Sequence, residues 1–284
     1  MSGQSFPQPA FPQAEPKPPL GMPAGPGQME YLRSFQYIFE NPNWFLNLLF
    51  SFLCNLAGQV IPIAPAMVIM GYQFEICEEL RINGGKRYSD FDINRLIDYL
   101  ARGVWPVLVL LMLALLSAVV LVPLFFATLV CSGAIGTAVG GEDAAGPFIV
   151  IGLVAFLFLG AALAAALSVY ATPMMLRAAY QQDIGAAFQF GWVNDFVGKM
   201  WLETLLSGLF LIFSVVALTL VTCGLAGLVL GPMMPFASAH LTQQLYSLYL
   251  SRGGTPIVFK PSARAMPTQP VVAGPPPGYQ PPKY

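Results

Sequence analysis

Long apolar runs dominate the middle of the chain. Four of them, at 105–131, 148–172, 201–223 and 225–250, carry no charged residue near their centres. A hydrocarbon core about 30 Å thick needs roughly 20 apolar residues in helical form. Each of these runs is long enough, so the pattern predicts four membrane-spanning helices.

A further apolar stretch, from 44 to 80, is interrupted by Pro62 and Pro65. Proline lacks an amide donor and breaks a helix. The pattern therefore predicts two helices, 44–61 and 64–80, joined by a tight turn. Because both are near the lower length limit for a span, two topologies stay open. The helices either cross the membrane as a hairpin, which we favour, or enter and return on one side as a re-entrant pair.

Composition places these helices in a membrane protein. Of 284 residues, 56% are hydrophobic and only 10% are charged, whereas a soluble domain carries about 25% charged residues. So few charges cannot cover a water-facing surface of this size. We therefore expect an all-α integral membrane protein with about six hydrophobic helices in three hairpins. The net charge of −1 excludes a polybasic nucleic-acid binder.

Proline marks the two ends of the chain. Of the 26 prolines, eight lie at 7–26 and nine lie at 256–282. Low-complexity segments of this kind bury too little apolar surface to fold. We expect disordered tails at 1–29 and 253–284 around a helical membrane domain at 30–252.

The basic residues predict an orientation. All 13 Lys and Arg residues lie before the first predicted helix, after the last one, or in the segments that follow the second and fourth predicted helices. Such residues accumulate on the cytoplasmic side of membrane proteins. The distribution predicts a multi-pass protein of the cell membrane with both termini in the cytoplasm. A re-entrant first pair of helices would give the same charge pattern.

Three short segments that mix aromatic and polar residues each precede a pair of hydrophobic helices. They lie at 31–43, 91–103 and 183–197. The simplest interpretation is a short amphipathic helix in the headgroup plane followed by a helical hairpin, used three times. The alternative is the ordinary enrichment of aromatic residues at membrane interfaces.

Some of these residues carry a family resemblance. The segment Arg33–Trp44 reads RSFQYIFENPNW, and later matches are Pro62–Pro65, Gly71-Tyr72 and Asp183–Phe188. Together they resemble the prokaryotic membrane family called domain of unknown function 4013, over about residues 31–252. The resemblance implies a prokaryotic multi-pass membrane protein and supplies no reaction.

Polar side chains inside the predicted helices are the first candidates for function. Four of them recur every fourth residue on one face of the 44–61 helix, and two lie on the last helix. They either line a polar path or hydrogen-bond to neighbouring helices, and we favour the packing role. The candidates are Asn47, Ser51, Asn55, Gln59, His240 and Gln243. No carboxylate partner for His240 is expected deep in any predicted span.

The sequence offers no set of residues for catalysis or for a cofactor. One His and four Cys without a C-x-x-C pair leave no zinc or haem site, and no phosphate-binding loop or nucleophile elbow occurs. Cys131 and Cys223 fall at predicted outer helix ends, where either a disulfide or two buried thiols would be compatible with the sequence.

These observations predict a non-enzymatic membrane scaffold or assembly module without a cofactor. The alternative is a small-solute transporter or channel that uses the polar face of the first helix and His240. We expect the lipid bilayer as the main partner, with other membrane proteins or a second copy of the chain as further candidates, and no nucleic acid.

Overall fold

The computed structural model describes residues 28–82, 88–224 and 226–260, and the regular elements in these ranges are all helical. This confirms the predicted all-helical class. Residues 1–27 and 261–284 of the predicted tails lie outside the described residues. The elements are α1 Arg33–Gln36, η1 Tyr37–Glu40, α2 Trp44–Gly58, α3 Ile63–Ile82, η2 Ile93–Arg95, α4 Leu96–Gly140, α5 Glu142–Gln181, α6 Ile184–Ala187, α7 Phe190–Val221 and α8 Ala226–Ser251.

Each of the six predicted hydrophobic helices forms, but they differ in their ability to cross a membrane. Within the described ranges, three stretches are long and apolar enough: Ile93–Gly140, Ala145–Gln181 and Phe190–Val221. The helix α2 is apolar but has only 15 residues. Neither α3 nor α8 belongs to the three, because α3 carries several charges and the second half of α8 is polar.

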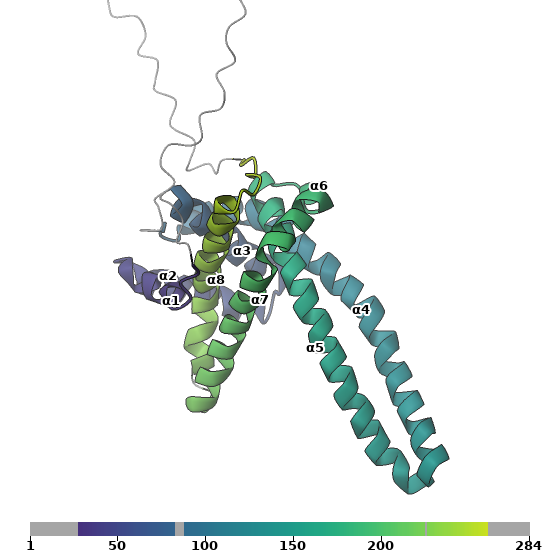
Figure 1. The fold of residues 1–284 in the computed structure, drawn as a ribbon. Helices are drawn as coiled ribbons and strands as arrows, with labels where there is room; N and C mark the ends of the chain where they lie inside the picture. Colours follow the sequence, from purple (N-terminus) through teal and green to yellow (C-terminus); the bar gives the residue numbers. More distant parts are fainter. Residues whose placement is uncertain (1–27, 83–87, 225, 261–284) are drawn as a thin grey trace, which may run out of the picture.

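The helices are arranged as hairpins that diverge from a common packed region, here called the base, where α3, α5 and α8 meet (Figure 1). The α4–α5 hairpin and the α7–α8 hairpin extend in the same general direction and separate toward their closed ends, while α2 runs crosswise to α7 and α8. No residue in the most apolar part of α5 is fully buried, although α4 packs along one side of it. The long hairpin therefore exposes apolar side chains on its outer surface.

The two helices of the long hairpin extend well beyond the predicted ranges 105–131 and 148–172. With 45 residues, α4 is about 68 Å long at 1.5 Å per residue, more than twice the thickness of a hydrocarbon core of about 30 Å. Its extension has two causes. Residues 96–104 stay helical because they pack on α3, and residues 132–140 lack a proline or a charge that would end the helix.

The three aromatic segments form only short helices of their own. The elements α1, η1, η2 and α6 have three or four residues each, and the remainder of the second and third segments is continuous with α4 and α7. Asp92 and Asp183 cap their helices by accepting hydrogen bonds at 2.9 Å from the amides of Asn94 and Gly185. The first segment differs, because Tyr37 is buried against α8.

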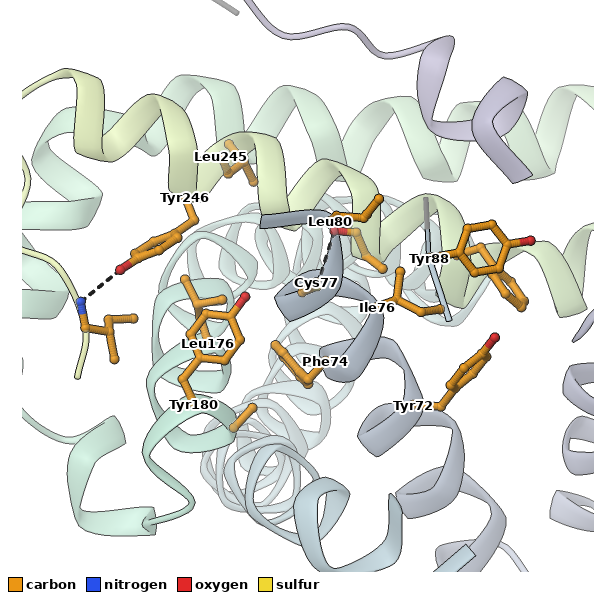
Figure 2. Close-up of a cluster of buried hydrophobic side chains, with 14 of the residues drawn as sticks. Tyr72, Phe74, Ile76, Cys77, Leu80, Tyr88, Leu176, Tyr180, Leu245 and Tyr246 are labelled. Carbon is orange, nitrogen blue, oxygen red and sulfur yellow. Dashed lines mark hydrogen bonds between the residues drawn. The ribbon is translucent and has the colours of Figure 1, made fainter. Parts of the chain in front are cut away.

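The core lies at the base, where α3, α5 and α8 meet, and it is rich in tyrosine (Figure 2). A buried tyrosine adds a large apolar ring but needs a hydrogen-bond partner for its hydroxyl. The Tyr72 hydroxyl donates to the Ser89 carbonyl at 2.8 Å, and the Tyr246 hydroxyl accepts from the Ile257 amide at 2.8 Å. The buried members are Tyr37, Tyr72, Tyr88, Tyr99, Tyr180, Tyr246 and Tyr249.

The backbones of α3 and α4 nearly touch where the two helices cross. A Cβ on Gly71 would lie 1.9 Å from the Tyr99 carbonyl oxygen, and a Cβ on Gly103 would lie 1.8 Å from the Met67 carbonyl oxygen. Only glycine fits at either position. The crossing fixes the base of the long hairpin against α3.

Candidate functional site

Asp90 is the centre of a polar cluster that joins residues 28–43, here called the N-terminal segment, to α2 and to the connection before α4. Its carboxylate accepts side-chain amide hydrogen bonds from Asn41 at 3.0 Å, Asn43 at 2.7 Å and Asn47 at 3.1 Å. Asn47 in turn accepts from the Phe91 amide at 2.9 Å. A carboxylate with this many amide donors holds its neighbours through charge-assisted bonds. The Asn-Pro-Asn part of the opening motif therefore has a structural role.

Tyr88 extends this cluster into the core. Its hydroxyl donates to the Ile38 carbonyl at 2.9 Å, and its own carbonyl accepts from Asn41 at 3.1 Å. Burial raises the pKa of Tyr88 to about 12, so the phenol stays protonated and continues to donate at neutral pH. The N-terminal segment is thereby joined to residues that lie almost fifty positions later.

The polar face of α2 is turned toward the protein for only half of its length. Asn47 is fully buried in the Asp90 cluster, and Ser51 donates to the Pro232 carbonyl of α8 at 2.9 Å. Asn55 is half-buried and donates to the Ser51 carbonyl of its own helix at 3.0 Å. Gln59 follows the end of α2 and is exposed. The four residues therefore do not form one continuous buried path.

The opposite face of α2 is apolar and exposed. This is the reverse of a helix in a soluble protein, where the apolar face is buried and the polar face meets water. The two buried residues of α2 are polar. The large side chains that it exposes are Phe45, Leu46, Leu49, Leu53 and Leu56.

His240 and its neighbours hold the start of the described chain against α8. The His240 Nδ1 atom lies 2.7 Å from the Gln244 side-chain nitrogen, and its ring stacks on Tyr37 at 4.5 Å between centroids. Gln244 also accepts from the Glu30 amide at 2.7 Å and donates to the Glu30 carbonyl at 3.1 Å. Gln243 donates to Ser247 at 3.2 Å.

The structure does not bring His240 to the polar face of α2. Ser51 meets α8 at Pro232. That position precedes His240 by eight residues, a distance of about 12 Å along the helix. Of the predicted candidates, only Ser51 joins α2 to α8 by a side-chain hydrogen bond among the described contacts.

Two ion pairs, one of them buried on both sides, fasten α3 to the start of α4. Arg95 donates to both carboxylate oxygens of Glu75, at 2.5 and 2.9 Å, and Arg102 donates to Glu78 at 2.5 Å. The side chains of Arg102 and Glu78 are each only 4% exposed. Ion pairs this well shielded are costly to break, because the remaining charge stays buried.

Sequence reasoning missed these carboxylates, since it expected no Asp or Glu deep in a predicted helix. Glu75 and Glu78, in the second half of the predicted 64–80 helix, are 2% and 3% exposed because they are buried against the start of α4. A signal was present in the spacing. The two glutamates are three residues apart and the two arginines seven apart, which places each pair on one face of its helix.

Residues 253–260, assigned by composition to the C-terminal tail, follow the surface of the base. Their backbone amides are bound by core tyrosines, because the Thr255 amide donates to the Tyr249 hydroxyl at 3.0 Å and the Lys260 amide donates to the Tyr180 carbonyl at 2.9 Å. Trp192 donates to the Thr255 carbonyl at 2.8 Å. Core tyrosines thus supply hydrogen-bond acceptors for the backbone amides of a segment that has no helical partners of its own.

Basic side chains meet aromatic rings and carbonyls at this base. The Arg81 guanidinium lies 3.6 Å from the centroid of Phe259, and that of Arg177 lies 5.1 Å from the centroid of Trp192. Such contacts hold a cation against a ring face. Lys199 donates to the Gly253 carbonyl at 3.2 Å. The basic residues that the sequence assigned to one membrane side thus also have packing roles.

The two cysteines considered above lie in different hairpins, and Cys131 lies nine residues before the end of α4. Cys131, on α4, and Cys223, in the turn after α7, are both free and both exposed. They belong to hairpins that diverge (Figure 1). The thiols are therefore neither paired nor buried in this structure. Among the described residues, no group of three His, Cys, Asp or Glu side chains is placed to hold a metal ion.

The sequence profile of one family matches residues 55–230. The match includes the Pro62–Pro65 turn, Gly71-Tyr72 and the 183–188 stretch, and it begins after the opening motif at 33–44. No curated protein and no solved structure matches the chain. Because the matched range covers more than half of the 284 residues, the chain belongs to the family described as "Protein of unknown function (DUF4013)".

Proposed function

We propose that this protein is a non-enzymatic scaffold in the cell membrane of a prokaryote, with six membrane-embedded helices and both termini on the cytoplasmic side. The observation that carries the proposal is the arrangement of α2, which buries polar side chains and exposes apolar ones. Lipid is the solvent that favours such a helix, because it accepts the apolar face and leaves the polar groups to bind one another.

The hydrogen-bond partners of the predicted polar residues favour a scaffold over a transporter. Asn47 binds Asp90 in the connection before α4, and Ser51 binds the Pro232 carbonyl of α8. His240 contacts Gln244 of its own helix and stacks on Tyr37 of the N-terminal segment. A permeation path would need polar groups that face a shared water-filled space. Gln59, which would continue such a path, lies on the outside instead.

Flux measurements distinguish the two functions. The variant Asn55→Leu/Gln59→Leu/His240→Leu removes the polar groups that a transporter would use. We expect proteoliposomes with the unaltered protein and with the variant to take up radiolabelled amino acids, radiolabelled sugars and chloride equally slowly, at the rate of protein-free vesicles. Saturable uptake by the unaltered protein that the variant lacks would refute the scaffold. Far-UV circular dichroism confirms that the variant is folded.

The length of α2 and the charges on α3 favour a pair of helices that reaches only part of the way through the bilayer. With 15 residues, α2 is about 22 Å long, which is shorter than the hydrocarbon core of about 30 Å. In α3, Glu75 follows only twelve residues after the helix start and is already buried in the charged contact with α4. We therefore propose that this pair is re-entrant, the alternative to the crossing hairpin favoured from the sequence.

Cysteine labelling at the α2–α3 turn tests this topology. In a background without the four native cysteines, Ile63→Cys is expected to resist an impermeant maleimide added from outside the cell. A single Cys223, retained in the α7–α8 turn, serves as the control and is expected to react from outside. Labelling of the Ile63→Cys protein from outside would show that α2 crosses the membrane.

A further inference from the structure

An apolar groove with a volume of about 660 Å³ runs along α7. Apart from the Tyr31 hydroxyl, its lining side chains are apolar, and those on α7 face outward along the helix. An exposed apolar surface of this kind marks a place where another apolar molecule binds. The lining includes Tyr31, Leu209, Phe210, Ile212, Phe213 and Val216.

The N-terminal segment forms the end wall of the groove. The rings of Tyr31 and Phe35 lie against Phe210, with centroids 5.3 and 5.9 Å away. Gln244 fixes this segment through its two hydrogen bonds to Glu30. The groove is therefore formed by contacts between residues that lie far apart in the sequence.

The length of the groove matches one leaflet of a membrane. Its lining on α7 extends from Leu206 to Val216, and ten residues of helix rise about 15 Å. Half of a hydrocarbon core of about 30 Å has the same depth. The groove thus has the length of the hydrocarbon zone of one leaflet.

Among the described residues, charged side chains lie at one end of the groove. The Tyr31 side chain interacts there with Ser207 and Glu203, and Arg252 pairs with Glu203 just beyond it. Lys199 lies one turn further along α7, paired with Asp195 at 2.8 Å. From this end the groove leads along the most apolar part of α7. This is the polarity of a phospholipid, with a charged headgroup at one end and a hydrocarbon chain at the other.

We propose that the groove binds one acyl chain of a cytoplasmic-leaflet phospholipid, with the headgroup beside Arg252 and Lys199. The site is formed jointly by α7 and the N-terminal segment, so the lipid would link them. The inference rests on the membrane placement in the proposed function, and it holds for a scaffold and for a transporter alike.

Photocrosslinking tests the site. The full chain is reconstituted in vesicles of phosphatidylethanolamine and phosphatidylglycerol with a trace of phosphatidylethanolamine that carries a diazirine in its acyl chain. Mass spectrometry is expected to find crosslinks to the peptide containing Phe213 at least fivefold more often than to the lipid-exposed Val119 region of α4. Leu209→Trp, which fills the groove, is expected to reduce the Phe213 crosslinks at least fivefold. The matched control on the same helix, Leu220→Trp, is expected to leave them unchanged.

Three results would overturn the proposal. Equal crosslinking at Phe213 and Val119 would mean that lipid only surrounds the protein. Disulfide-linked dimers of a Leu209→Cys variant would assign the groove to a second copy of the chain. Absence of crosslinks at both positions would contradict the membrane placement itself, so failure of the site and failure of the proposed function give different outcomes.

Discussion

Replacing Gly103 with alanine is expected to lower the free energy of unfolding by at least about 3 kcal/mol, the upper part of the range for overpacked cores. The new Cβ would lie 1.8 Å from the Met67 carbonyl oxygen and 2.7 Å from the Gly71 amide nitrogen. These are backbone atoms of α3, which cannot rotate aside as a side chain can. The two helices must separate, and the neighbouring ion pairs are strained with them. Titration with SDS in mixed micelles, followed by circular dichroism, measures the loss.

Gly208→Ala is the matched control for this prediction. Gly208 also lies inside a long helix, but a Cβ there would have no neighbour within 4 Å. Alanine is the better helix former by about 1 kcal/mol, so this variant is expected to be as stable as the unaltered protein or slightly more stable. Equal stability of the two variants would contradict the close crossing of α3 and α4.

Glu78→Gln is expected to destabilise the protein by about 3–5 kcal/mol, the cost of removing one partner from a buried ion pair. The substitution keeps the shape of the side chain and removes its charge. Arg102 then remains buried with an uncompensated positive charge, since its Nε and Nη1 atoms have no hydrogen-bond partner among the described residues. The same SDS titration measures the effect.

Two controls separate the loss of this pair from a general effect of charge removal. Glu40→Gln breaks the Arg33–Glu40 pair, whose side chains are 41% and 43% exposed, and is expected to cost at most about 1 kcal/mol. The double variant Glu78→Met/Arg102→Met is expected to recover most of the lost stability, because no unpaired charge remains. A loss for Glu78→Gln no larger than that for Glu40→Gln would show that the buried pair does not fasten α3 to α4.

Local features of the sequence were sufficient to locate the helices. The turn between α2 and α3 follows from Pro62, and α2, α3 and α8 begin within one residue of the predicted helices. The main errors are in α4, α5 and α7, which extend well beyond their predicted ranges. In α5, Pro147 and Pro173 flank the predicted range 148–172 and lie inside the helix without ending it. Proline is compatible with a membrane helix when nearby groups satisfy the freed carbonyl, so its presence alone does not define a helix end.

The partners of the candidate residues were beyond sequence reasoning. Asn47 and Ser51 stood out because they recur on one helix face, yet their partners lie 43 residues away at Asp90 and 181 residues away at Pro232. Spacing identifies which side chains share a face, and it gives no information about which helix covers that face. The same limit applies to Glu78 and Arg102, whose spacing fits a pairing that only the packing of α3 on α4 creates.

The sequence by itself determined that this is an all-helical membrane protein, which segments are hydrophobic helices, where the basic residues gather and which family it belongs to. These are properties of short stretches: the shortage of charge and the length of the apolar runs indicate the membrane helices, and short motifs carry the resemblance to the family. Only the tertiary structure decided which polar groups bind one another, why Gly71 and Gly103 must be glycine, and that the N-terminal segment completes a groove on α7. Such features depend on backbone separations of a few ångströms between distant residues, and those separations are set by the packing of whole helices.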